Sequence, residues 1–93
     1  MIVGYCLIEI YIPSSNSLKG KRRILKSIIN RVKNRFNVSI AEVDDHNLWR
    51  KATLGVACVS NNGRQVNVVL DKVIDYIEMD KEIDIIDYSV ELV

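Results

Sequence analysis

Residues 2–12 (IVGYCLIEIYI) constrain the fold most, because both of the side-chain sets that alternate along an extended strand are apolar. The even-numbered set has no polar residue, and the odd-numbered set has a single charge, Glu9. A strand of this kind usually lies inside a sheet and is covered on both sides. Pro13 ends the run because it has no N–H for a sheet hydrogen bond. We therefore predict that this strand is central in its sheet.

Two later segments have the periodicity of helices with one apolar face. In residues 17–36 Ser17 can cap the helix start, and apolar residues recur at spacings of three, four and seven: Leu18, Leu25, Ile28, Ile29, Val32 and Phe36. Residues 64–79 follow an Asn-Asn-Gly break and repeat the pattern with Val66, Val69, Leu70, Val73, Ile74 and Ile77. Each helix can bury one face only.

Three further strands complete the pattern. We predict strands at residues 38–43 and 53–60, and a last strand after a turn at 80–82 in which Ile86, Tyr88, Val90 and Leu92 share one face. The order is β-α-β-β-α-β, without a linker or a repeat. Right-handed crossovers then give one α+β domain over residues 1–93, a ferredoxin-like four-stranded antiparallel sheet with both helices on one face.

The charge of the chain is strongly polarised although the net charge is only +1. Residues 10–41 carry eight basic and no acidic side chains, whereas residues 42–93 carry five basic and eleven acidic ones. The apolar N-terminal run is too short to span a membrane and lacks the flanks of a signal peptide. We therefore expect a cytoplasmic protein without membrane contact, in which Cys6 and Cys58 are reduced core residues.

The chain resembles a known family in four segments: MIVGYCLIEIYIP, SLKGKRRILKSIINRVKNRFNVSIAEV, LWRKATLGVACVSN and VLDKVIDYIE. It is similar to the YlxP-like family, a bacterial domain of unknown function. The resemblance implies a ferredoxin-like fold, no established catalytic residues, and an RNA-linked role suggested by genes that neighbour those of translation. Gly20 departs from the family, which tends to have a Glu there that completes a capping box with Ser17.

The basic residues of the first helix are the candidate site. Cations on one rigid surface can neutralise phosphates of RNA or of a ribosome, with Lys19, Lys21, Arg22, Arg23, Lys26, Arg31, Lys33 and Arg35 as the predicted contacts. The alternative is a solvated face that pairs in part with Asp71, Asp75 and Glu78 of the second helix.

The sheet face away from the helices is the second candidate surface. We expect it to be apolar and to form a homodimer interface, with Val3, Tyr5, Leu7, Ala57 and Val59 at its centre and Ala41, Val43 and Gly55 beside them. An aromatic platform for RNA bases is disfavoured on this face, because residues 53–60 contain no aromatic side chain.

Other polar groups have simpler interpretations. Glu42, Asp44, Asp45 and His46 could suggest a metal, but their order fits no EF-hand or zinc site, and we expect a polar hairpin loop. Trp49 is expected to pack over an open edge of the sheet. No nucleophile or acid–base set can be assembled, so we expect a non-enzymatic protein without a cofactor or metal. A dimeric scaffold or regulatory protein that binds an acidic protein or a small ligand is the alternative to RNA binding.

Overall fold

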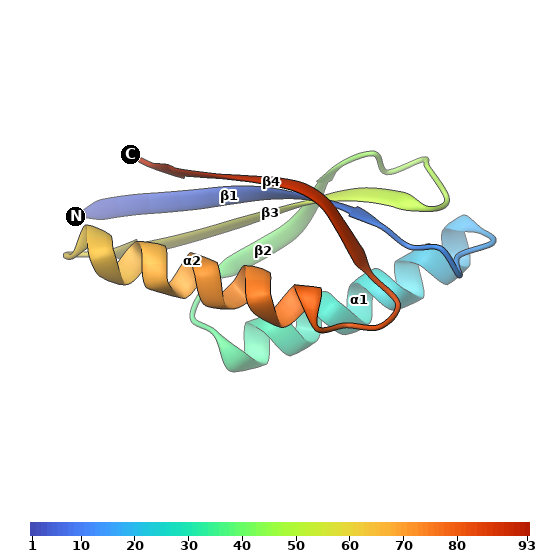
Figure 1. Cartoon of the computed structure of the whole chain (residues 1–93), viewed down its shortest axis with the longest axis horizontal. Helices are drawn as coiled ribbons and strands as arrows, with labels where there is room; N and C mark the ends of the chain where they lie inside the picture. The colour runs from blue at the N-terminus through green and yellow to red at the C-terminus, as the bar shows by residue number, and fades with distance from the viewer.

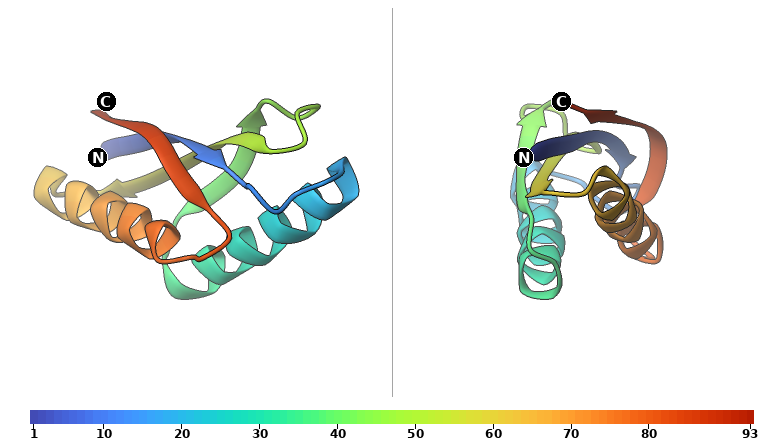
Figure 2. Two further views of the ribbon diagram at one scale, coloured as in Figure 1. Left: turned by 45° about the vertical axis from the view of Figure 1, so that its right-hand side comes forward. Right: turned by 90° about the vertical axis from the view of Figure 1, so that its left-hand side faces the viewer.

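A computed structural model describes residues 1–93 and contains the six predicted elements in the predicted order. The strands are β1 (Ile2–Tyr11), β2 (Ser39–Asp44), β3 (Lys51–Ser60) and β4 (Asp84–Leu92), and the helices are α1 (Leu18–Arg35) and α2 (Gly63–Glu78). Both helices lie on the same side of one sheet (Figures 1 and 2). The α+β, ferredoxin-like fold is confirmed. β3 begins at Lys51, before the predicted start at Thr53, so the loop that precedes it is shorter than predicted.

The sheet has the strand order β2-β3-β1-β4, and all neighbours are antiparallel. β1 is central, as its apolar sequence predicts. Its even-numbered residues face the helices, and Cys6, Ile8 and Ile10 are fully buried. The odd-numbered residues face the opposite side, which no element covers (Figure 2). In the single chain the strand is therefore covered on one face only.

Cys6 and Cys58 lie on neighbouring strands and are free thiols. Burial raises the pKa of Cys6 to about 11 and also raises the pKa of Cys58. Both thiols are therefore protonated at neutral pH and behave as small apolar side chains. Neither helix has a stretch of apolar residues long enough to cross a bilayer.

The last strand differs from its predicted alternation. The antiparallel pairing of β1 with β4 contains a bulge at the step from Glu9 to Ile10. The bulge shifts the register of β4, so that Ile85, and not Ile86, lies opposite Ile10. Ile85 packs against the core, and Ile86 is 55% exposed. The prediction that Ile86 shares a face with Tyr88 and Val90 is thus wrong, because one extra residue reverses the side on which a strand's side chains point.

Gly4 sets the distance between the central strand and α2. A Cβ atom at this position would lie 2.1 Å from Cγ1 of Val66, and it would also crowd Leu70 and Leu92. The absence of a side chain lets the helix pack directly onto the strand. Gly20 of α1 is different, because a Cβ there would meet only Ser17 and Ser15 at 3.4 Å or more.

We predict that Gly4→Ala destabilises the fold by about 1–3 kcal/mol, because α2 must move away from β1 to admit the methyl group. Gly20→Ala is the matched control and should stabilise the protein by up to about 1 kcal/mol, since alanine is the better helix former. Urea unfolding of both variants measures the two effects. Equal stability of the wild type and Gly4→Ala would show that the strand and helix are not in tight contact.

Candidate nucleic-acid interface

The N-terminal half of α1 carries the exposed cations. Ser17 caps this helix by accepting a hydrogen bond from the Gly20 N–H at 3.0 Å, as predicted. Beyond the cap, a shallow depression is lined only by polar and basic residues and glycine: Ser17, Lys19, Gly20, Arg22, Arg23 and Lys26. The four cations among them are exposed and make no ion pair, and Lys33 further along the helix is also exposed and unpaired.

The two arginines in the C-terminal half of α1 are exposed and contact other residues of the chain. Nη2 of Arg31 lies 2.6 Å from Oδ2 of Asp80, which raises the pKa of Arg31 through this hydrogen bond. The guanidinium of Arg35 lies over the ring of Tyr76, 5.1 Å from its centroid. The predicted ion pairs between α1 and Asp71, Asp75 and Glu78 of α2 do not form. The acidic partner of Arg31 is instead Asp80, in the turn after α2. The two arginines are less available to a ligand than the cations at the other end.

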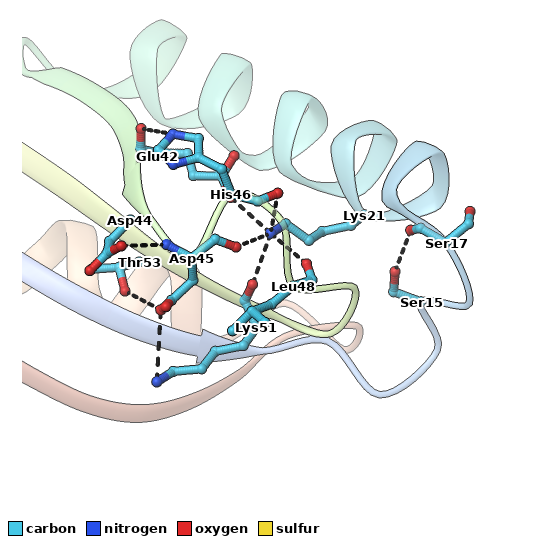
Figure 3. A network of polar contacts seen from close by, with 10 residues as sticks. All are labelled: Ser15, Ser17, Lys21, Glu42, Asp44, Asp45, His46, Leu48, Lys51 and Thr53. Carbon is cyan, nitrogen blue, oxygen red and sulfur yellow. Dashed lines mark hydrogen bonds and ion pairs between the residues drawn. The ribbon is translucent and has the colours of Figure 1, made fainter.

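Lys21 does not belong to the exposed stripe, although it was predicted to contact phosphate. Its side chain is fully buried, and it is the largest of the fully buried side chains. It points from the first turns of α1 into the β2–β3 loop (Figure 3). A phosphate cannot reach its ammonium in this conformation, so the prediction for Lys21 is corrected.

The buried ammonium is surrounded by oxygen atoms of the β2–β3 loop. Nζ donates to the carbonyls of Asp45 and Leu48, both at 2.7 Å, and to that of Lys51 at 2.9 Å, with the His46 carbonyl at 3.4 Å. Oε2 of Glu42 lies 2.9 Å away and forms the ion pair that balances the charge. An ammonium has three protons, which the carbonyls of Asp45, Leu48 and Lys51 can accept, whereas Oε2 of Glu42 has no hydrogen-bond partner and is held by its charge.

Asp45 turns the loop so that its carbonyl can face Lys21. It is the only residue other than glycine with a positive φ, 64°, a conformation that Asp tolerates better than most residues. Its Oδ2 accepts a hydrogen bond from Thr53 at 2.8 Å, and its N–H donates to Oδ1 of Asp44. The carboxylates and His46 of this segment thus act in a polar loop, and no group of three converges on a point where a metal could bind.

The helical spacing contained a signal for Lys21. Residues 18, 21, 25, 28 and 32 follow one another at intervals of three and four, the spacing of a single helix face. All of these except Lys21 are apolar, and Ile24, absent from the predicted apolar face, is also buried beside them. A lysine is fully buried only when it is paired, so a lysine on the apolar face of a helix indicates that oxygen partners lie opposite it.

Trp49 is not a packing anchor. It is 56% exposed, and the neighbouring Leu48 is 48% exposed. The chain on its C-terminal side is held by Arg50, whose Nε donates to the Ser15 carbonyl at 2.9 Å and whose carbonyl accepts from the Ile12 N–H at 2.7 Å. The prediction that Trp49 covers an open sheet edge is corrected, since the loop projects the ring into solvent.

The predicted dimer residues share the outer sheet face, on the side away from the helices. Val3, Tyr5 and Leu7 face Val59, Ala57 and Gly55 across the β1–β3 pairing, and Val43 lies over Gly55. Leu7, Val43 and Val59 are exposed. The hydroxyl of Tyr5 donates to Oε2 of Glu91 at 2.9 Å. Near the β2–β3 loop the same face becomes acidic, with a depression that contains Glu9, Asp44 and Asp87.

Comparison with known proteins supports the resemblance found in the sequence. A family model described as "Protein of unknown function (DUF503)" matches residues 3–90. The chain is also 37% identical over 83 residues to a protein of Bacillus subtilis (strain 168) described as "Uncharacterized protein YlxP". That alignment covers 89% of this chain and 90% of the relative. Neither description states a function for these relatives.

We predict that Lys21→Met destabilises the fold by about 3–5 kcal/mol, because it leaves the Glu42 carboxylate and the loop carbonyls without their cation. Lys19→Met removes the same charge from an exposed position and should change stability by no more than about 0.5 kcal/mol. Urea unfolding separates the two variants. Similar stabilities for Lys21→Met and Lys19→Met would show that the buried ammonium is dispensable.

Proposed function

Because the chain belongs to the DUF503 family of proteins of unknown function, its membership supplies no activity, and we propose one from its surface. The protein is a non-enzymatic RNA-binding protein that contacts the phosphate backbone of RNA, free or in the ribosome, through the N-terminal half of α1. The proposal requires a cytoplasmic location, where ribosomes are found. The contacts are Lys19, Arg22, Arg23 and Lys26, extended by Lys33.

One observation carries the proposal: four exposed cations lie within eight residues of one helix, and none of them has an acidic partner. Arg22 and Lys26 are one turn apart, about 6 Å along the axis. The helix is capped and packed on the sheet, so the backbone that carries these cations is ordered before binding. Neutralising phosphates with such cations releases the counterions of the RNA, which favours binding.

The composition of the surface favours RNA over an acidic protein. The depression on α1 is lined by no apolar side chain. Protein–protein interfaces usually have an apolar core surrounded by a polar rim, and this surface has no such core. A phosphate backbone needs only positive charge and hydrogen-bond donors. The acidic depression on the outer sheet face would repel RNA, so the protein would approach with α1 in front.

We predict that a triple variant, Arg22→Gln, Arg23→Gln and Lys26→Gln, binds structured RNA or purified ribosomal subunits more weakly. The slope of log affinity against log salt concentration should flatten by about 0.9 per lost contact for duplex RNA and by about 0.7 for single strands. Glutamine is a comparable helix former, so the fold should be kept. Fluorescence anisotropy over a series of salt concentrations measures the slope.

The matched control removes three exposed positive charges elsewhere: Arg64→Gln, Lys72→Gln and Lys81→Gln. Its net charge equals that of the first variant, so long-range attraction to RNA falls by a similar amount in both. If the α1 cations contact phosphate, only the first variant changes the slope strongly. An unchanged slope in a folded α1 variant, or equal slopes in both, would mean that the stripe is a solvated surface.

A second proposal concerns the outer sheet face, and the exposed apolar residues there favour it. We propose that two copies pair through the apolar half of this face, around Val3, Tyr5, Leu7, Ala57 and Val59. Val59 is 63% exposed and Leu7 is 41% exposed in the single chain. A two-fold axis near Tyr5 and perpendicular to the strands would keep the acidic depressions of the two copies apart, at opposite ends of the interface.

We predict that the wild-type protein sediments as a dimer at concentrations on the order of tens of micromolar and that Leu7→Glu sediments as a monomer, because the new charge would be buried in the interface. Val68→Glu places the same charge on an exposed position of α2 and should remain dimeric. Sedimentation of the wild type as a monomer would remove this proposal and leave the proposed RNA contact unaffected.

A further inference from the structure

The β2–β3 loop presents the only tryptophan of the chain to solvent. This loop lies at the end of the molecule where α1 begins (Figure 1), and within it Leu48 and Trp49 are both exposed. The core does not use this ring, and neither does the outer sheet face. An exposed tryptophan beside an exposed leucine, neither of which packs on the core, suggests that the loop contacts a ligand.

The loop is held on both sides of the ring. On one side the Leu48 carbonyl is bound by Nζ of Lys21 at 2.7 Å. On the other side Arg50 is bound to Ile12 and Ser15 of the β1–α1 segment. Trp49 thus sits on a loop whose backbone is ordered before any partner arrives, which reduces the entropy lost on binding.

The same contacts bring the loop that carries Trp49 to the first turns of α1. Nζ of Lys21 donates to the carbonyl of Leu48, the residue before Trp49 (Figure 3). Trp49 therefore lies at the end of the molecule where the exposed cations of α1 begin, although these cations project into solvent and Lys21 projects into the protein. Positive charge that follows the backbone and an aromatic side chain on which a base stacks are the two components of a site for single-stranded nucleic acid.

We infer that Trp49 stacks on an unpaired base of an RNA whose phosphates contact α1. The inference rests on the proposed function and makes it more specific, since it names single-stranded RNA or a loop of a folded RNA as the ligand. Bases of an A-form duplex are stacked on each other and are not available to a side chain. The exposed tyrosines of the sheet are less suited to this role, because Tyr5 is bound to Glu91, Tyr88 lines the acidic depression and Tyr11 pairs across the sheet with Asp84.

The test uses the wild-type protein, whose single tryptophan reports its own surroundings. An oligouridylate of about 12 nucleotides is compared with a duplex RNA of mixed sequence. The single strand should quench the Trp49 fluorescence and protect the ring from iodide, and the duplex should do neither. Trp49→Leu should bind the single strand roughly 5- to 150-fold more weakly, and Trp49→Phe should keep most of the affinity.

The salt slope separates this inference from the proposed function. Trp49→Leu removes no charge, so its slope should equal that of the wild type, whereas the triple α1 variant should flatten it. If the single strand binds with a normal slope while Trp49 remains open to iodide and Trp49→Leu binds equally well, stacking is overturned and phosphate binding stands. The loop would then be a surface for a protein. If neither RNA binds, both proposals are overturned.

Discussion

The buried ammonium of Lys21 is the interaction that joins α1 to the β2–β3 loop, at the end of the molecule that carries the proposed RNA contacts. Removing a lysine from water is costly, and the cost is offset here by several carbonyls and one carboxylate at 2.7–3.4 Å. These oxygen atoms all belong to β2, the following loop and the start of β3. One side chain of α1 thereby fixes the position of the loop backbone relative to the helix.

The sheet divides the molecule into two sides of different chemistry. On one side Gly4 lets α2 approach β1 closely, and α1 packs beside it, so this side holds the whole core. The other side is open and changes from apolar to acidic along the strands. The exposed cations lie on α1, and many acidic residues lie on the later elements. The separation of positive and negative charge along the sequence is therefore kept on the surface of the folded protein. Such a molecule is oriented by a charged partner before contact.

Charge and shape have different roles in the proposed interface. Cations such as Arg22 and Lys26 attract any phosphate backbone, and they carry no information about base or strand. An ordered aromatic ring adds a preference for accessible bases. Pre-organisation of both groups by caps, core packing and the Lys21 contacts lowers the entropy that binding must overcome. The arrangement therefore needs no catalytic group or cofactor to be selective for a class of RNA.

The sequence by itself determined the element order, the central position of β1, the capped helices and the concentration of positive charge on α1. These are local properties, because periodicity, capping and charge depend on residues a few positions apart. Tertiary structure decided the fates of Lys21, Trp49 and Ile86. Lys21 meets oxygen atoms of Glu42 and of residues 45–51, all distant in the chain, and these partners are not visible in the helix sequence apart from a lysine at an apolar position. The exposure of Trp49 follows from the same long-range contacts, and Ile86 was displaced by a bulge formed only on pairing with β1. Local patterns state which face of an element is apolar, whereas the burial of a single polar or aromatic group depends on partners that folding brings together.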